Sequence, residues 1–415
     1  MVAYHFPPLA GSSGIQRSLR FAQHLPSFGW EPLVLSAAPH AYERTSPDLD
    51  TEVPEGLVVR RAFALDASRH LAFHGRYPGF LARPDRWATW KFAAVRMGLK
   101  MIREFRPDAL WTTYPIATAH VIGARLHAQS GLPWVADFRD PMAQDGYPED
   151  AKTWAMYKDL EEAVIRAARC SVFATAGAAQ EYRNRYPAYA ENIRVIENGY
   201  DQDSFAEAEQ DAVALGRLTN GHLTILHSGI VYPSERDPTN LFEALARIKQ
   251  IHGATASRLR VRFRAAVHEA LLRDLAKNFQ VEDMVEVEPP IGYRQALIEM
   301  MRADALLVLQ AANCNMQIPA KVYEYLRAGR PLLVLSDLAG DTAQVLQSAG
   351  VRRIARLDST EEIVTILGEF LSDPGNPAFR PSIHAVRNAS REARTRELAA
   401  VLEQASSGRG AGTTS

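Results

Sequence analysis

The sequence predicts an α/β fold with two doubly wound, Rossmann-like domains that face each other across a cleft. Short apolar segments of strand length alternate with helical segments, and this alternation pauses after Ile196 and restarts at Leu223. Strands that are apolar on both faces and separated by helices are typical of parallel sheets covered by helices. The length of 415 residues also exceeds what one hydrophobic core normally supports, so two domains are expected.

The first half of the chain is expected to form one of these domains, over residues 1–197. Its strands are predicted at residues 2–6, 32–35, 57–63, 109–112, 133–136, 171–174 and 193–196. Its main helices are predicted at residues 87–105, 116–129, 153–168 and 178–186.

The second domain is expected over residues 222–384. Its strands are predicted at residues 223–227, 259–264, 284–287, 305–309, 331–335 and 351–354. Its helices are predicted at residues 239–250, 268–278, 293–302, 319–328, 342–348 and 361–371. Residues 198–221 lack a clear strand and are predicted to be a hinge and linker. A helix at 385–405 is expected to pack back toward the first domain, and the polar tail at 406–415 is expected to be disordered.

The composition narrows the class of partner and compartment. The formal net charge of -1 argues against general binding to nucleic acid. Only Cys170 and Cys314 are present, too few for a disulfide framework, and no apolar stretch approaches the length of a membrane span. The sequence therefore predicts a cytoplasmic protein.

The segment at 318–337, IPAKVYEYLRAGRPLLVLSD, predicts a short helix followed by a strand. Pro319 suits the first helical turn and Gly329 suits the end of the helix. Lys321 lies in the first turn, where the helix dipole disfavours a cation unless an anion is nearby. Glu324 shares its face and can accept hydrogen bonds from two hydroxyls. This pair suits a nucleotide sugar, although an ordinary surface pair of charges is the alternative.

Two segments of the first domain carry further candidate residues. The loop PPLAGSSGIQR follows the first strand, and its glycines would let backbone amides approach a phosphate, although a plain turn is the alternative. In VADFRDP, Asp137, Arg139 and Asp140 leave an apolar strand at its carboxyl end, where functional side chains gather in parallel sheets. The alternative for VADFRDP is a structural salt bridge from Arg139 to either aspartate.

Cationic and aromatic residues are interleaved between residues 69 and 106. The cations are Arg69, Arg76, Arg83, Arg86, Lys91, Arg96, Lys100, Arg103 and Arg106, and the acids are only Asp85 and Glu104. The aromatic residues include Tyr77, Phe80, Trp87, Trp90 and Phe92. This pattern suits an anionic membrane surface or a lipid-diphosphate acceptor. The alternative is a solvated helix whose Trp and Phe side chains face the core.

Four segments, in order along nearly the whole chain, resemble the GT-B-fold retaining glycosyltransferases of the large family 4-like group. That group contains sucrose synthase-like enzymes and bacterial polysaccharide and lipid-sugar transferases. FPPLAGSSGIQR resembles its N-terminal loop, VIENGYDQDSF its interdomain segment, and SGIVYPSERDPTNLFEAL the start of its C-terminal domain. RADALLVL followed by IPAKVYEYLRAGRPLLVLSD resembles its nucleotide-binding core.

The resemblance implies roles for particular residues. The residues implied at the donor are Gly11, Ser12, Ser13, Gly14, Arg236, Lys321 and Glu324. Arg236 and Lys321 would contact the phosphates, and Glu324 would hold the ribose hydroxyls. Asp140, and after it Asp137, would orient the acceptor hydroxyl or the donor sugar as catalytic residues.

One position departs from the family pattern. The family commonly has a second Glu eight positions before Glu324, where it contacts the transferred sugar, and here that position is Met316. Nearby Asn313, Asn315 and Gln317 are expected to supply neutral hydrogen bonds instead.

The resemblance implies transfer of a sugar, with retention, from a nucleotide-diphosphate sugar to a hydroxyl of a glycan or lipid-linked acceptor. The setting would be cell-surface polysaccharide or glycolipid synthesis, with possible contact of residues 69–106 with the inner face of the membrane. No cofactor, metal or nucleic acid is expected. The alternatives are a non-catalytic nucleotide-sugar-binding subunit and a GT-B nucleotide-sugar epimerase or hydrolase.

Overall fold

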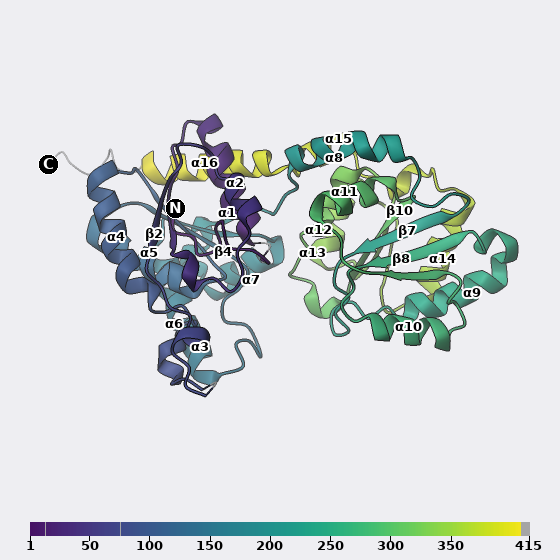
Figure 1. Cartoon of the computed structure of the whole chain (residues 1–415), viewed down its shortest axis with the longest axis horizontal. Coiled ribbons are helices and arrows are strands. Elements are labelled where there is room, and N and C mark those ends of the chain that lie inside the picture. The colour runs from purple at the N-terminus through teal and green to yellow at the C-terminus, as the bar shows by residue number, and fades with distance from the viewer. Residues whose placement is uncertain (13, 75, 408–415) are drawn as a thin grey trace. The chain divides into compact units, whose positions relative to one another are not determined.

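The computed structural model describes residues 1–12, 14–74 and 76–407 (Figure 1). The chain forms two compact units. Unit 1 contains residues 1–198 together with the segment that begins at Arg391, and unit 2 contains residues 199–390. No helix in the described ranges is long and apolar enough to cross a membrane.

Unit 1 contains a parallel sheet that has two parts, and residues 1–3 connect these two parts. Its strands are β1 (Leu33–Ala37), β2 (Val58–Ala62), β3 (Leu110–Thr113), β4 (Trp134–Arg139), β5 (Cys170–Phe173) and β6 (Ile193–Val195). β1 pairs with β2, and the other part has the order β3-β4-β5-β6. Val2 bridges Leu35 of β1 and Thr112 of β3 in parallel fashion, so the start of the chain lies between the two parts.

Helices cover the sheet of unit 1. They are α1 (Gly14–His24), α2 (Pro47–Thr51), α3 (Ala67–His70), α4 (Trp90–Phe105), α5 (Ala117–Ser130), α6 (Ala151–Ala167), α7 (Ala176–Arg185) and α16 (Arg391–Ser407). The 3₁₀ helices are η1 (Leu25–Phe28), η2 (Pro39–Ala41), η3 (Gly79–Ala82) and η4 (Pro187–Asn192). α16 contacts α1, η1 and β4, and its Leu398 and Leu402 are buried beside Val135.

Unit 2 contains one six-stranded parallel sheet in the order β12-β11-β10-β7-β8-β9. The strands are β7 (Leu223–Ser228), β8 (Leu259–Arg264), β9 (Val285–Glu288), β10 (Ala305–Gln310), β11 (Leu332–Ser336) and β12 (Ile354–Ala355). The strand order reverses between β7 and β10. In open parallel sheets this switch point is where loops diverge and ligands bind.

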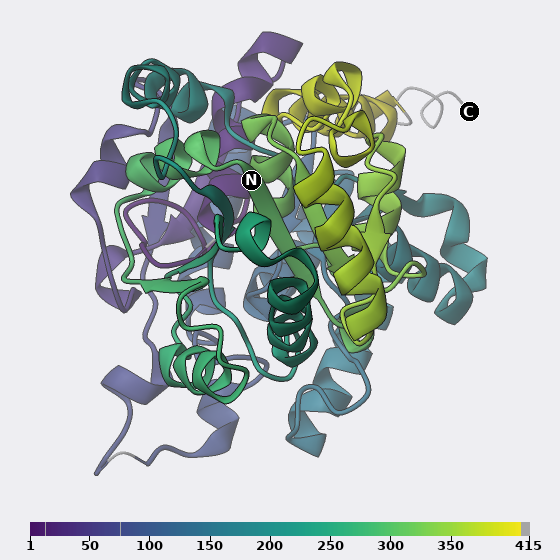
Figure 2. The same cartoon turned by 90° about the vertical axis from the view of Figure 1, so that its right-hand side faces the viewer.

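The helices of unit 2 lie on both faces of its sheet (Figure 2). They are α8 (Gln202–Leu215), α9 (Thr239–Ala256), α10 (Glu269–Asn278), α11 (Tyr293–Arg302), α12 (Lys321–Ala328), α13 (Asp341–Ser348), α14 (Thr360–Ser372) and α15 (Ile383–Asn388). The 3₁₀ helices are η5 (Ala312–Cys314) and η6 (Pro377–Phe379). Each face of the sheet has its own hydrophobic core, because successive residues of a strand point to opposite faces. Leu307 packs on the face with α9 and α14, and Leu306 packs on the other face.

The structure differs from the expected elements at several places. Residues 198–221 are not a plain linker, because α8 forms there and buries Phe205 on the body of unit 2. The single helix expected at 385–405 is two helices: α15 packs against α12 in unit 2 and α16 packs in unit 1. The strand expected at 2–6 pairs only through its first residues, since the chain bends near Tyr4. Of the predicted tail at 406–415, two residues complete α16 and residues 408–415 lie outside the described ranges.

Candidate functional site

Two loops diverge at the switch point of the unit 2 sheet. The loop after β7 contains Gly229 and Arg236, and the loop after β10 leads into α12, which begins at Lys321. The backbone N–H of Ser228, the last residue of β7, donates to the buried Tyr325 hydroxyl of α12 at 2.8 Å. This bond ties the first two turns of α12 to the end of β7 and so brings the two loops together.

Lys321 lies directly over Gly229. A Cβ atom built on Gly229 would lie 3.0 Å from the Lys321 Cδ and 3.3 Å from its Nζ, and closer still to Cε. The Gly229 φ of 144° is also one that side chains rarely adopt. Because Gly229 has no side chain, the Lys321 side chain can lie against the Gly229 backbone.

Arg236 is the second cation of this site. Its Nη1 donates to the Ile230 carbonyl at 2.8 Å, and its guanidinium lies over the Tyr232 ring, 5.6 Å from the centroid. Its Nε is buried and has no hydrogen-bond partner among the described residues. A buried donor without a partner is the kind of group that a bound anion would satisfy.

The electrostatics of this site favour an anion. Burial lowers the pKa of Lys321, nearby Arg236 lowers it further, and Glu324 opposes the shift. Burial also lowers the pKa of His227 on β7 to about 4, with Lys321 and Arg236 contributing. Two cations and a helix N-terminus that are close together and partly desolvated are stabilised by a negatively charged ligand.

Glu324 lies one turn after Lys321, as the sequence predicted. Its Oε1 accepts a hydrogen bond from the Tyr293 hydroxyl at 3.0 Å, and this contact is exposed. Tyr293 is the first residue of α11. A carboxylate in an exposed hydrogen bond can exchange that partner for ligand hydroxyls.

The loop around Met316 differs from the expectation that its amides face a sugar. The Asn313 amide donates to the Ser234 carbonyl at 2.8 Å, and the Asn315 amide donates to Asp337 at 2.6 Å. The amide N–H groups of both asparagines therefore hold this loop to its neighbours, the loop after β7 and the end of β11. Met316 is 40% exposed and Gln317 is exposed beside it.

In unit 1, the predicted glycine-containing loop begins α1. The Ser12 hydroxyl accepts from the Gly14 backbone N–H at 3.3 Å and pairs with His5 Nδ1 at 3.1 Å. A Cβ on Gly14 would lie 2.6 Å from Nη1 of Arg139, so the arginine can lie against the start of α1 only because position 14 has no side chain. Gly11 is exposed with φ 84°. Ser13, the remaining predicted residue of the loop, lies outside the described residues.

Asp137 takes part in a buried ion pair that the sequence did not predict. Both of its oxygens bind Arg17 of α1, at 2.8 Å to Nε and 2.9 Å to Nη2, and Thr113 donates to it at 3.1 Å. The side chains of Arg17 and Asp137 are 3% and 0% exposed. Arg17 also donates to the Ile196 carbonyl at 2.9 Å, so the pair links α1, β4 and the end of β6.

Asp140 directly follows β4 and lies three residues beyond its last regular pairing, at Asp137. The register shifts between Asp137 and Arg139, and Arg139 has φ 64°. Among the described residues, no hydrogen bond or ion pair occupies the Asp140 carboxyl group. Burial raises its pKa, while Arg139 and Arg17 act to lower it. A carboxyl group with a raised pKa at the carboxyl edge of a sheet suits proton transfer or hydrogen bonding to a hydroxyl.

A buried cluster holds the turn that follows Asp140. The Tyr182 hydroxyl accepts from the Met142 N–H at 2.9 Å and donates to Glu161, and Glu161 also accepts from the Ala143 N–H at 3.2 Å. Arg185 donates to the Ala143 carbonyl at 2.9 Å and to Glu161 at 2.7 Å. No sequence motif indicated this cluster, because its members are spread over α6 and α7.

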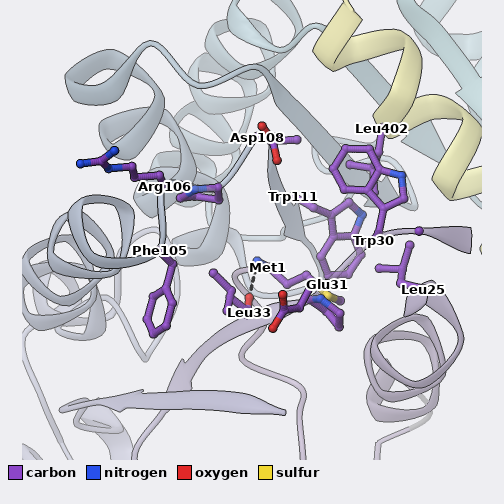
Figure 3. A pocket seen from close by; sticks show the side chains of 14 residues that line it. Met1, Leu25, Trp30, Glu31, Leu33, Phe105, Arg106, Asp108, Trp111 and Leu402 are labelled. Atoms are coloured by element: carbon purple, nitrogen blue, oxygen red, sulfur yellow. Dashed lines mark hydrogen bonds between the residues drawn. The ribbon is translucent and has the colours of Figure 1, made fainter. Parts of the chain in front are cut away.

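One pocket of unit 1 lies apart from these residues (Figure 3). It has a volume of about 310 Å³ and is lined by Trp30, Trp111 and Leu402 among others, with the Met1 amino group donating to the Leu33 carbonyl at 2.7 Å. It lies where β1 and β3 begin, whereas Asp140 follows the end of β4. In the described ranges, no three His, Cys, Asp or Glu side chains could together hold a metal ion.

Comparisons with known proteins agree with the fold. Residues 13–199 match the model described as Glycosyl transferase 4-like domain. HepE from Anabaena in complex with UDP is 14% identical with a TM-score of 0.66, over 95% of this chain and 98% of HepE. Sucrose-phosphate synthase from Thermosynechococcus elongatus is 13% identical with a TM-score of 0.61, over 97% and 96% of the two chains.

A third solved structure extends the same likeness. α,α-Trehalose 6-phosphate synthase from Burkholderia multivorans is 13% identical with a TM-score of 0.64, over 98% of this chain and 95% of that one. None of the curated proteins matches the chain significantly in sequence. The predicted GT-B fold is confirmed: the chain shares the fold of these glycosyltransferases, and residues 13–199 match a glycosyl transferase 4-like domain, as the resemblance predicted.

Proposed function

We propose that the chain transfers a sugar, with retention, from a nucleotide-diphosphate sugar to a hydroxyl of a glycan or lipid-linked acceptor during cell-surface polysaccharide or glycolipid synthesis. The observation that carries the donor part is the position of Lys321 over Gly229, beside Arg236 at the switch point of unit 2. HepE has been solved with UDP and with UDP-glucose, which supports a nucleotide sugar as the donor class.

The two cations would act on the leaving group. When the bond between sugar and diphosphate breaks, negative charge develops on the diphosphate, and positive groups held in advance at that position stabilise it. Such groups are supplied by Lys321, Arg236 and the first turn of α12. They need no reorganisation, because Lys321 already lies against Gly229 and Arg236 already donates a hydrogen bond to the Ile230 carbonyl. Metal-independent transfer remains our prediction.

Glu324 would bind the ribose hydroxyls. It lies one helical turn from Lys321, which matches the short separation between a diphosphate and the ribose that carries it. The Tyr293 hydroxyl would leave Glu324 or share it with the ligand.

In unit 1, we assign the proposed catalytic role to Asp140 rather than Asp137. The Asp140 carboxyl group has no ion pair within the described residues and its pKa is raised, so it suits hydrogen bonding to an acceptor hydroxyl or a donor sugar. Both oxygens of Asp137 already bind Arg17, so Asp137 is proposed to position the end of β4. The loop with Gly11, Ser12 and Gly14 would lie at the donor.

Binding of UDP and 2′-deoxy-UDP, measured by calorimetry, tests the donor site. Lys321→Ala is expected to weaken both about ten- to hundredfold, because a charge-assisted hydrogen bond contributes about 1.5–3 kcal/mol. Glu324→Ala is expected to remove the preference for UDP over its 2′-deoxy analogue. Lys277→Ala, at an exposed lysine on α10, is the matched control and should bind as the wild type does. If UDP, GDP and ADP all fail to bind, or if Lys321→Ala binds normally, the donor site is assigned wrongly.

Product analysis tests retention and the reaction class. The anomeric configuration of the product, read from its NMR coupling constants, must equal that of the donor; inversion would overturn the proposed stereochemistry. Donor consumption without any acceptor would instead favour an epimerase or hydrolase.

One observation favours a second candidate, a non-catalytic nucleotide-sugar-binding subunit. Met316 stands where a carboxylate is expected, and the Asn313 and Asn315 amides already donate to Ser234 and Asp337 of neighbouring loops. The loop therefore has few side-chain groups left that could form hydrogen bonds with a sugar. Tight UDP-sugar binding without turnover across a broad acceptor panel would support this candidate, and turnover with any acceptor would exclude it.

A further inference from the structure

The exposed face of α4 is a cationic stripe with an aromatic residue at one end. Phe92, Arg96, Lys100 and Arg103 are all exposed, and their spacings of four, four and three residues place them on one side of the helix. Trp90, Ala94, Gly98 and Met101 have the same spacing and are buried. We call the four exposed residues the α4 stripe.

Tight packing fixes the direction in which this stripe points. A Cβ atom on Gly98 would lie 2.8 Å from Cδ1 of Leu126 on α5 and 3.3 Å from Cδ2 of Leu35 on β1. The helix backbone is therefore pressed against its neighbours at this glycine and cannot rotate without a clash. α4 lies at the outside of unit 1 (Figure 1), and its stripe faces solvent.

The charges of the stripe are not neutralised within unit 1. Among the described residues, Arg96, Lys100 and Arg103 form no ion pair, and the one acid of α4, Glu104, pairs with Arg60 of β2 at 3.3 Å. The neighbouring helix α5 has no acidic residue. A row of like charges is unfavourable by itself and is stabilised by an extended anionic partner.

Phe92 indicates which anionic partner this is. Its side chain is 66% exposed, and the Lys91 ammonium lies 5.1 Å from the centroid of its ring. Cations beside an exposed aromatic ring suit the interface of a membrane, where the ring enters the headgroup region and the cations reach lipid phosphates. Trp87 and Trp90 do not contribute: Trp90 is fully buried and Trp87 is half-buried, as the alternative interpretation of this segment expected.

We propose that the α4 stripe binds a membrane leaflet that contains anionic lipid. The stripe runs about 16 Å along the helix, so all three cations can approach one headgroup plane together. A membrane surface would also suit the lipid-linked class of acceptor, but vesicle binding needs neither donor nor acceptor. The proposal can therefore be tested whether or not the proposed transfer reaction is correct.

Co-sedimentation with vesicles is the test. Wild-type protein is mixed with vesicles of phosphatidylcholine alone or with three parts in ten phosphatidylglycerol, at low and high salt. Each cation near such a surface contributes about fivefold in affinity, so the triple variant Arg96→Gln, Lys100→Gln, Arg103→Gln should bind about a hundredfold more weakly. Phe92→Ser should weaken binding further and at both salt concentrations, since its contribution is apolar.

A matched triple variant controls for loss of charge in general. Lys277→Gln, Arg352→Gln and Arg387→Gln remove three exposed cations of unit 2 and should leave vesicle binding unchanged. The proposal is overturned if the wild type does not prefer anionic vesicles, if the α4 triple variant binds like the wild type, or if both triple variants lose binding equally. Binding to duplex DNA or RNA through the stripe, without vesicle binding, would also overturn it.

Discussion

Removing the charge of Asp137 should destabilise unit 1 severely. In the variant Asp137→Asn, the Arg17 guanidinium would stay buried at 3% exposure without its counter-ion, while its bonds to the Ile196 and Glu197 carbonyls hold it in place. Loss of one partner of a buried ion pair typically lowers the free energy of unfolding by 3–5 kcal/mol, and we expect about 4 kcal/mol here. Asp137→Asn keeps the shape of the side chain, so packing should change little.

A double variant separates the charge effect from the packing effect. Arg17→Met combined with Asp137→Leu leaves no buried charge, and apolar replacements of a buried pair are often close to neutral. The Ile196 and Glu197 carbonyls lose a donor, which keeps the double variant about 1–3 kcal/mol below the wild type. The double variant should therefore be more stable than Asp137→Asn alone.

Tryptophan fluorescence can follow unit 1 alone. The six tryptophans of the chain are Trp30, Trp87, Trp90, Trp111, Trp134 and Trp154, and all belong to unit 1. Urea titration of this signal gives the free energy of unfolding of unit 1, while UDP binding by calorimetry reports on unit 2. If Asp137→Asn loses less than about 1 kcal/mol, or if the double variant is less stable than Asp137→Asn, the buried pair does not hold the end of β4.

Three further predictions concern single substitutions. Gly229→Ala should displace Lys321 and weaken UDP binding about ten- to hundredfold, as Lys321→Ala does, and combining the two should add little. His120 is buried, and burial lowers its pKa in the folded state to about 4. The unfolded chain therefore binds more protons between pH 6.5 and 4, and unit 1 should lose stability as the pH falls through that window. Urea titrations of His120→Gln should show that the free energy of unfolding depends less on pH than in the wild type. Tyr182→Phe should raise the hydrogen-exchange rate of the Met142 amide on the order of tenfold and slow sugar transfer, with UDP binding unchanged.

The sequence predicted the unit 2 fold closely because most of its strands can be recognised from their local sequence pattern. β8, β10 and β11 are continuous apolar or alternating runs bounded by breaks, and each lies within about one residue of its predicted range. α8 was missed because its sequence is rich in alanine and acidic residues and has few large apolar side chains. Its burial depends on packing against α11, which no local pattern reports.

The candidate site was predicted unevenly for a similar reason. Lys321 and Glu324 share one short helix, so their spacing alone placed them on the same face. The Arg17–Asp137 pair joins residues 120 positions apart, and the sequence offered Arg139 as the nearer partner. Arg139 instead reaches the start of α1, because the bulge after Asp137 turns it away from the strand face.

The link between Gly229 and Lys321 also explains why a lysine, and no bulkier cation, stands at the start of α12. Its slender methylene chain passes over a residue with no side chain, and its ammonium lies 3.3 Å from where a Cβ would be. A planar guanidinium is broader than an ammonium and would need the space that the Gly229 backbone and Arg236 already occupy. Lys321→Arg should therefore keep the charge yet weaken UDP binding, and in a Gly229→Ala background the same substitution should change UDP binding little further. Gly229, in the loop after β7, and Lys321, at the start of α12, thus act together in holding the cation, although they are 92 positions apart in the sequence.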